Sequence, residues 1–266
     1  MPSSDLKIPA EHASNLVNPA AYAGQRIHET YAWLRANQPL GVAEIEGFDP
    51  FWVVTRHADI LEISRQNALF LNGARSPTIT TKAIDETVRK MMGGSPHLLR
   101  TLIHMDAPDH PKYRLLTQAW FMPPNLKRLE DRIRGIARNS VAKMLATGGR
   151  CDFVREVALH YPLHVVMEIL GVPEEDEPRM LMLTQELFGA SDPELRRKFE
   201  GDTDEAAQLR NGVIADFYAY FARLSAARKA EPKDDLATLI ANSQVDGRPI
   251  SELEAMSYYI IVATAG

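Results

Sequence analysis

The stretch His104–Arg114, HMDAPDHPKYR, decides how the rest of the chain is understood. Its prolines and aspartates are typical of a helix start, which we place near Asp109. His110 and Arg114 then share one helical face, with their Cβ atoms about 5–6 Å apart. The helix dipole and the unpaired backbone N–H groups of the first turns add positive potential there. Two donors in this setting suit a carboxylate or a phosphate.

Two other interpretations of this stretch remain open. The first is a solvated surface helix on which His110 and Arg114 form an incidental pair. The second is a metal site made by His104, Asp106, Asp109 and His110. The spacing of these residues matches no closed or catalytic zinc pattern, and the neighbouring prolines restrict how their side chains could converge.

Helical periodicity dominates the chain that follows. It predicts helices near residues 109–121, 125–147, 156–170, 176–189, 204–230, 234–242 and 251–266. The last begins with a capping box, Ser251 to Glu254, and carries no charge after Glu254, so we expect burial on nearly all its sides. A free carboxylate at the end of such a helix would be costly to bury. We therefore expect the chain to be the front part of a longer protein.

The preceding part is more mixed. Residues 1–20 are predicted to form an arm over the surface, and residues 71–103 lack a firm period, which usually marks a functional or mobile loop. Other patterns predict a helix within 21–37, strands within 41–47 and 51–56, a turn at 47–50 and a helix at 57–66. Together these elements predict one mainly-α domain with a small N-terminal β-sheet.

Composition excludes several classes of protein. The 266 residues are 45% hydrophobic and 24% charged, with a net charge of −5, so the chain has no nucleic-acid footprint. A single cysteine rules out an internal disulfide framework and suits a reducing cytoplasm. We find no signal peptide, and the longest apolar run, 258–266, is far short of the roughly 20 residues of a membrane span. We expect a cytoplasmic protein with no membrane partner.

Three motifs, in order and in register, resemble one family. MDAPDHPKYR (105–114) resembles the D-x-P-x-H-x-x-x-R signature of the cytochrome P450 haem-thiolate monooxygenases. WLRANQPL (33–40) with FWVVTRHADILEI (51–63) resembles the first helix, hairpin and second helix of the bacterial members. IIVATAG (260–266) resembles the opening of their A-G-x-[DE]-T-T motif. Residues 151–189 are most similar to the branch that hydroxylates α-terpineol.

The resemblance implies an incomplete cytochrome P450 fold, a single domain over 1–266 that ends inside the central distal helix. It implies that His110 and Arg114 hold the propionates of haem b, and that the small Ala265 and Gly266 occupy the catalytic position. Ile261 and Thr264 would face the substrate, although plain helix packing is the alternative. The loop before the His–Arg helix would line the pocket through Leu98, Leu99, Thr101, Leu102 and Ile103, with hydroxyls from Thr78, Thr80, Thr81 or Thr101 to orient an alcohol.

The family's thiolate-ligand loop, F-x-x-G-x-x-x-C-x-G, is absent from these residues. Cys151 has no Gly two residues later and no Phe before it, so we predict a small, partly buried structural residue. The axial cysteine is expected beyond Gly266.

The function that the resemblance implies is insertion of one oxygen atom from dioxygen into a small hydrophobic substrate, a terpenoid alcohol or an aromatic hydrocarbon. Electrons would come from NAD(P)H through a ferredoxin reductase and a ferredoxin. Residues 110–138 hold seven basic and two acidic side chains, a patch that could dock an acidic iron–sulfur protein. The alternatives are a non-catalytic helical binding module for a hydrophobic ligand or porphyrin, and a His/Asp metal hydrolase.

Overall fold

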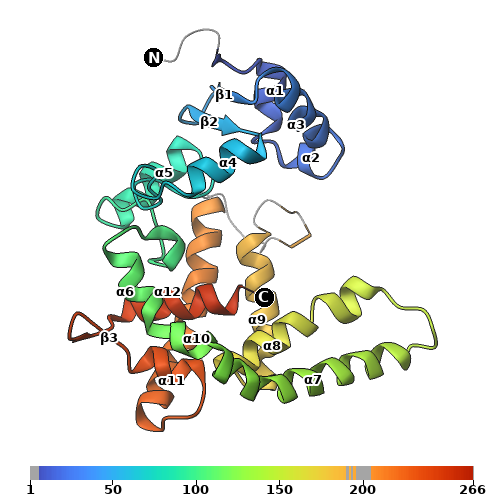
Figure 1. Ribbon diagram of the computed structural model, residues 1–266, viewed down its shortest axis with the longest axis vertical. Helices are drawn as coiled ribbons and strands as arrows, with labels where there is room; N and C mark the ends of the chain where they lie inside the picture. Colours follow the sequence, from blue (N-terminus) through green and yellow to red (C-terminus); the bar gives the residue numbers. More distant parts are fainter. Residues whose placement is uncertain (1–5, 190–191, 193, 196–204, 266) are drawn as a thin grey trace. The chain divides into compact units, whose positions relative to one another are not determined.

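The computed structural model describes residues 6–189, 192, 194–195 and 205–265 (Figure 1). The chain divides into two compact units, residues 1–98 and 99–266. Each unit has its own core of buried apolar side chains, so each is described by itself.

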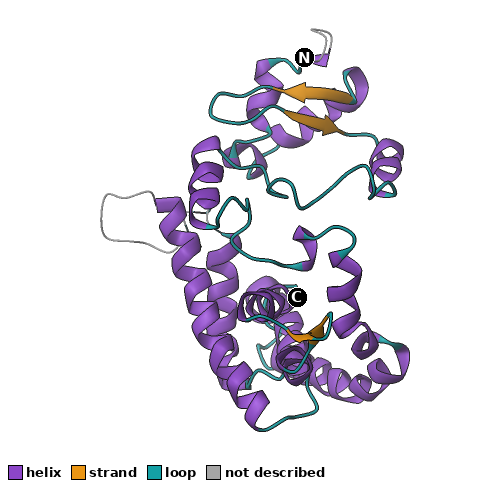
Figure 2. Ribbon diagram, turned by 90° about the vertical axis from the view of Figure 1, so that its left-hand side faces the viewer, coloured by secondary structure: helices purple, strands orange, loops and turns teal. Residues whose placement is uncertain are grey.

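The first unit combines short helices with a two-stranded antiparallel sheet. Strand β1 (Leu40–Ala43) pairs with β2 (Phe51–Val54) in the register Leu40↔Val54 to Ala43↔Phe51 (Figure 2). The helices are α1 (Ala10–Asn15), α2 (Pro19–Tyr22), α3 (Arg26–Asn37), α4 (His57–Ser64) and α5 (Lys82–Met91). The predicted helix within 21–37, the two strands and the helix at 57–66 are confirmed.

The predicted N-terminal arm is wrong for residues 6–20, while residues 1–5 lie outside the described residues. Ile8, Ala13 and Leu16 are buried in the core of the first unit, together with Ile27 and Leu34 of α3. The Ile8 backbone N–H donates to the Val42 carbonyl at 2.9 Å, which ties the segment to β1. Scattered apolar residues among Pro, Ser and Asn therefore suffice to fold this segment, because α3 and the sheet present an apolar surface to it.

The segment at 71–103 is less irregular than its sequence suggests. Helix α5 occupies Lys82–Met91, and the Thr81 hydroxyl caps it by accepting from the Ile84 N–H at 3.3 Å. An ion pair between Arg89 and Asp85, one turn apart at 2.6 Å, adds to its stability. Ile84, Val88 and Met91 stand at i, i+4 and i+7, and Val88 is buried, so the apolar spacing within 82–91 could have revealed this short helix.

The second unit is almost entirely helical. Its main helices are α6 (Asp109–Gln118), α7 (Pro123–Leu145), α8 (Tyr161–Leu170), α9 (Glu177–Phe188), α10 (Glu205–Ala230), α11 (Leu236–Ala241) and α12 (Glu252–Ala263). All the helices predicted after residue 108 are confirmed, with ends that shift by a few residues. The burial expected for the last helix is confirmed too, since every residue from Glu254 to Ile260 is buried.

The core of the second unit lies where α8 and α10 meet α12. Helix α8 packs against α7, α9 and α12, while α10 packs against α9, α11 and α12. Aromatic rings fill the centre, with Phe221 stacked between Phe217 at 6.0 Å and Tyr259 at 5.1 Å. Such rings bury large apolar areas and hold α12 against α10.

A short β-hairpin, missed from the sequence, precedes α12. Strands β3 (Gln244–Val245) and β4 (Arg248–Pro249) pair across Asp246 and Gly247. Both turn residues have positive φ, 51° and 77°, as a two-residue hairpin turn requires. The Asp-Gly pair is the signal that could have revealed it. Within the described residues, no helix has the length and apolar character to cross a membrane.

Candidate functional site

One face of α6 links the two predicted anion-binding residues to a cavity. His110, Arg114, Thr117 and Phe121 follow one another at steps of four, three and four, which keeps them on one side of α6 and of the 3-10 turn (Ala119–Phe121) that extends it. Thr117 and Phe121 line the cavity. His110 and Arg114 therefore continue the cavity-lining face toward the start of the helix.

The cavity has a volume of about 250 Å³ and is mainly apolar. A second wall is the face of α12, where successive turns bring one set of side chains to the same side. The third wall is α8. The lining residues are Leu102, Thr117, Phe121, Val166, Ile169, Tyr258, Ile261, Val262 and Ala265.

The two hydroxyl groups of the cavity wall already have partners. Thr117 Oγ1 lies 2.7 Å from Tyr258 Oη, and Tyr258 donates to the Tyr113 carbonyl at 3.3 Å. Because both hydroxyls are used within the protein, the wall presents an apolar surface to a ligand. Few polar anchors in an apolar cavity are typical of sites for small hydrophobic molecules.

The charges on α6 differ in what they contact. Lys112 pairs with Asp246 at 2.5 Å, and Asp109 pairs with Arg100 at 2.6 Å. Neither His110 nor Arg114 makes a side-chain hydrogen bond or ion pair with any residue that the structure describes. The His110 backbone N–H donates to the Asp106 carbonyl at 2.9 Å, so only the side chains can serve an anion.

Arg114 acts electrostatically on the cavity wall. Burial raises the pKa of Tyr258, and the hydrogen bond with Thr117 and the positive charge of Arg114 partly offset this rise. The charge of Arg114 thus favours the ionised form of the Tyr258 hydroxyl and offsets part of the rise in its pKa. An anionic group at this end of the cavity would meet an exposed, unpaired cation.

The other predicted site residues divide between the cavity and the surrounding structure. Leu102, Ile261 and Ala265 line the cavity, and Leu99 packs against the core of the second unit. Thr101 is buried, with its hydroxyl 3.1 Å from His104 Nδ1, and Thr264 donates to the Ile260 carbonyl at 2.8 Å. Ile103 is 55% exposed, Leu98 is the last residue of the first unit, and Gly266 lies outside the described residues.

Several lining residues were not predicted. Thr117 and Phe121 lie three and seven residues after Arg114, so helical spacing alone could have added them. Tyr258 and Val262 flank the predicted Ile261 on α12. Val166 and Ile169 on α8 carry no such signal, because only packing of α8 against α12 brings them to the cavity.

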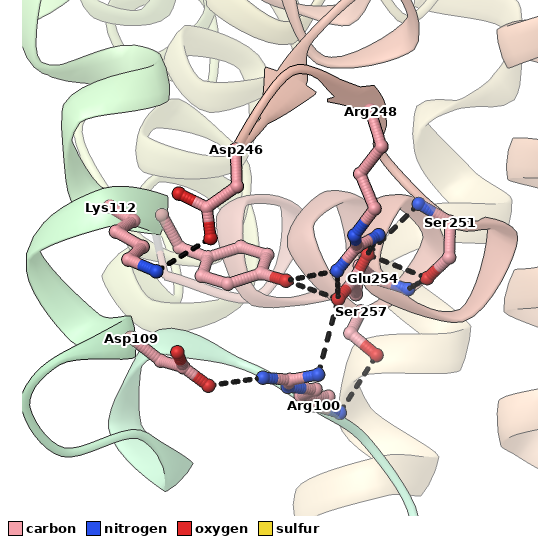
Figure 3. Close-up of polar contacts among 9 residues, drawn as sticks. Arg100, Asp109, Lys112, Asp246, Arg248, Ser251, Glu254 and Ser257 are labelled. Atoms are coloured by element: carbon pink, nitrogen blue, oxygen red, sulfur yellow. Dashed lines mark hydrogen bonds and ion pairs between the residues drawn. The ribbon is translucent and has the colours of Figure 1, made fainter.

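A buried carboxylate, Glu254, joins α6, α12 and two loops (Figure 3). Its side chain is 3% exposed. Oε1 accepts from Tyr113 Oη, from Arg100 Nη1 at 3.2 Å and from Arg248 Nη2 at 3.2 Å. Oε2 accepts from the Ser251 N–H at 2.9 Å, from the Ser251 hydroxyl at 2.7 Å and from Arg248 Nη1 at 3.2 Å.

The partners of Glu254 keep it ionised. Burial alone would raise the pKa of this carboxyl, but hydrogen bonds from Arg248, Tyr113 and Ser251 outweigh burial and lower the pKa to about 2. Burial and the bond to Glu254 raise the pKa of the Tyr113 hydroxyl, which stays a proton donor. A buried charge with this many donors is electrostatically satisfied and forms part of the architecture.

The metal-site interpretation finds no support in the geometry. His104 Nδ1 lies 2.8 Å from the Leu99 carbonyl, and Asp109 pairs with Arg100. In the part of the chain that the structure describes, no three His, Cys, Asp or Glu side chains gather closely enough to hold a metal ion.

Known proteins share both the sequence and the fold. Cytochrome P450-terp from a Pseudomonas species is 43% identical over 262 residues, which are 97% of this chain and 61% of that protein. The crystal structure of CYP108D1 from Novosphingobium aromaticivorans matches 98% of this chain and 61% of its own, with 42% identity and a TM-score of 0.83. The chain belongs to the cytochrome P450 superfamily.

Further relatives are more distant. Linalool 8-monooxygenase from Pseudomonas putida is 29% identical over 89% of this chain and 56% of its own length. The structure of Mycobacterium marinum cytochrome P450 CYP268A2 with pseudoionone is 25% identical over 100% of this chain and 61% of its own, with a TM-score of 0.79. No protein-family model matches the chain. The chain spans about three fifths of the length of cytochrome P450-terp and of CYP108D1.

The residues present fit one edge and one face of the prosthetic group of cytochromes P450. Haem b is a flat apolar macrocycle with two carboxylates on one edge. The apolar walls of α6, α8 and α12 match the macrocycle, and the unpaired side chains of His110 and Arg114 match the carboxylates. The iron ligand is not among the cavity-lining residues.

Cys151 is exposed, which corrects the expectation that it is partly buried. It follows the Gly148-Gly149 turn after α7 and does not line the cavity. With no apolar surroundings to enclose it, Cys151 serves neither as a core residue nor as a cavity ligand.

Proposed function

We propose that this protein is a haem-thiolate monooxygenase that hydroxylates a small hydrophobic substrate with dioxygen. The observation that carries the proposal is the face of α6, on which unpaired His110 and Arg114 lead directly into the apolar cavity. An apolar cavity alone would accept many ligands. An unpaired arginine at its end selects those that combine an apolar body with an anionic edge.

His110 and Arg114 would hold the propionates of haem b by charge-assisted hydrogen bonds. Bound haem with a thiolate ligand supplies the activation of dioxygen. The chain's own contribution is a dry, apolar wall that orients the substrate by shape. Ala265 places a small side chain in that wall where α12 ends, and Ile261 and Leu102 add larger apolar side chains to it.

The proposed substrate class is a terpenoid alcohol or an aromatic hydrocarbon. The names of cytochrome P450-terp and linalool 8-monooxygenase support the first of these. In the first unit, the Thr78 hydroxyl lies 3.2 Å from that of Ser76 and the Thr81 hydroxyl caps α5. The buried Thr80 hydroxyl lacks a partner among the described residues, so of these three threonines only Thr80 keeps its hydrogen-bonding capacity unused.

We also propose electron delivery from NAD(P)H by a ferredoxin reductase and a ferredoxin. Much of the predicted basic patch is neutralised within the fold. Arg128 pairs with Asp234, Arg132 with Glu168 and Arg134 with Glu130. Arg114, Lys127 and Arg138 form no ion pair with the described residues and would contribute most to docking an acidic partner.

The test is the haem content of Arg114→Ala in the protein expressed from its natural gene. Loss of the guanidinium leaves a propionate without its charged partner, so we expect the haem bound per protein to fall about tenfold. Arg138→Ala is the matched control, because Arg138 is also exposed and unpaired within the described chain but lies on α7. Equal haem content in the two variants would contradict the proposed role of Arg114.

The carbon monoxide difference spectrum separates the monooxygenase from the binding module. A strongly red-shifted Soret band in the reduced protein supports a thiolate ligand and the proposed activity. A haem band without that shift, or no haem, favours the non-catalytic alternative.

A further inference from the structure

The Leu102 loop (Leu99–His104) carries one cavity-lining residue, Leu102, and is anchored on both sides of this residue. Before Leu102, the Arg100 backbone N–H donates to Ser257 Oγ at 2.9 Å, and Ser257 is fully buried on α12. After Leu102, His104 Nδ1 lies 2.8 Å from the Leu99 carbonyl and closes the loop on itself. Leu102 thus has a defined place relative to α12.

The Arg100 side chain binds two helices at once. Its Nη1 reaches Glu254 on α12 at 3.2 Å, and its Nη2 reaches Asp109 on α6 at 2.6 Å (Figure 3). Its guanidinium also lies 5.2 Å from the centre of the Tyr113 ring, within the range of a cation–π contact. The planar fork of arginine suits such bridging, which a lysine point charge cannot reproduce.

Glu254 divides its two oxygens between two tasks. Oε2 accepts from Ser251 and so completes the capping box at the start of α12. Oε1 accepts from Arg100 and from Tyr113, and Arg248 donates to both oxygens. A capping box needs only the first set of bonds. The second set connects α12 to the Leu102 loop and to α6.

We propose that Arg100, held by Glu254, is a positioning residue that sets Leu102 and the Arg114 face of α6 at their working distance from α12. The inference rests on the proposed function, since the cavity between these elements is the proposed site. The polar contacts of Arg100 go to Ser257, Glu254 and Asp109, none of which lines the cavity, so Arg100 acts through Leu102 and through α6.

Arg248 provides a matched control for Arg100. Both arginines bind Glu254 with contacts of 3.2 Å, and both are partly exposed, 40% for Arg100 and 53% for Arg248. Arg248 belongs to the β3–β4 hairpin and is not a residue of the Leu102 loop. Arg100→Met and Arg248→Met therefore each remove one cation from Glu254, but only the first removes the side-chain bonds that tie the loop to Glu254 and Asp109.

Two measurements compare these variants. Hydrogen–deuterium exchange of the backbone amides at 99–104 reports the anchoring, and we expect faster exchange in Arg100→Met only. Spectral titration of the haem-loaded protein with α-terpineol reports the cavity, and we expect the Kd to rise about tenfold in Arg100→Met and less than about twofold in Arg248→Met. Arg100→Lys should keep the weak binding of Arg100→Met, because lysine cannot bridge Glu254 and Asp109.

Equal exchange at 99–104 in the two methionine variants would overturn the proposal. So would equal Kd values for α-terpineol, which would mean that Arg100 has only the general stabilising role it shares with Arg248. A wild-type protein that purifies without haem would instead contradict the proposed function. Exchange confined to Arg100→Met would then still support the anchoring of the Leu102 loop.

Discussion

Helices α6 and α12 contact each other at two places that differ in whether their charged side chains have partners. Around Glu254, every charge has partners, with Arg100, Arg248, Tyr113 and Ser251 converging on one buried carboxylate. Arg114, on the side of α6 that continues into the cavity wall, carries a charge with no partner among the described residues. The first arrangement is complete without a ligand. The second leaves a cation that a bound anion would neutralise, as the proposed function requires.

The difference predicts where mutations will act. Changes in the Glu254 cluster should lower the stability of the fold, because the cluster uses its charges internally. Changes in the Arg114 face should lower the affinity for haem or substrate with less effect on folding. Each prediction below tests this division, beginning with the largest expected effect.

Replacing the central carboxylate should have the largest effect. Glu254→Leu leaves Tyr113 and two arginines without their acceptor, so we expect the free energy of unfolding to fall by about 3 kcal/mol. Urea unfolding followed by circular dichroism measures it. Glu252→Leu, in the same first turn but exposed, should change it by less than about 0.5 kcal/mol. Similar losses in both variants would mean that the cluster does not stabilise the fold.

The low pKa of Glu254 predicts a loss of stability in acid. In the folded state the pKa is about 2, whereas the unfolded value is 4.5, so the folded state binds fewer protons. The resulting stabilisation is fully present above pH 4.5 and is lost as the pH falls toward 2. Between pH 5 and pH 3 the wild type should lose about 2 kcal/mol more than Glu254→Gln. Parallel pH dependences of the two urea midpoints would contradict the assigned pKa.

The smallest effect concerns the hydroxyl pair in the cavity wall. Tyr258→Phe leaves the Thr117 hydroxyl without its partner, which should cost about 1 kcal/mol of stability. Haem content should match the wild type, since this pair serves the protein and not the ligand. Thermal unfolding and haem quantification of the same sample test both parts. A loss of haem as large as that of Arg114→Ala would place Tyr258 with the ligand-binding residues.

Most of the second unit could be predicted because its helices have strong signals. Apolar periodicity, the Ser251–Glu254 capping box and the glycine and proline breaks place each helix within a few residues. The errors fall where the signals are local and weak. Helix α5 is short and is marked by its Thr81 cap and by three apolar residues at helical spacing. The β3–β4 hairpin is marked by an Asp-Gly pair, and the N-terminal segment packs on an apolar surface formed by distant residues.

The candidate site was predictable in part for the same reason. His110 and Arg114 follow from helical spacing, and Ile261 and Ala265 follow from the motif on the last helix. Arg100 and Glu254 have no spacing that connects them, since 154 residues separate the two. Glu254 can be recognised from the sequence as a capping residue. Its bonds to Arg100 and Tyr113 depend on how the Leu102 loop and α6 pack against α12.

The sequence by itself determined the helices, the family resemblance and the pair of donors on one face of α6. Each of these depends on residues a few positions apart, whose geometry the helix sets. Only the tertiary structure decided that α8 closes the cavity, that Cys151 stays exposed and that Arg114 lacks the partner that Arg100 has. These outcomes depend on which side chains from distant parts of the sequence come into contact when the helices pack. The spacing of residues within one helix does not determine those contacts.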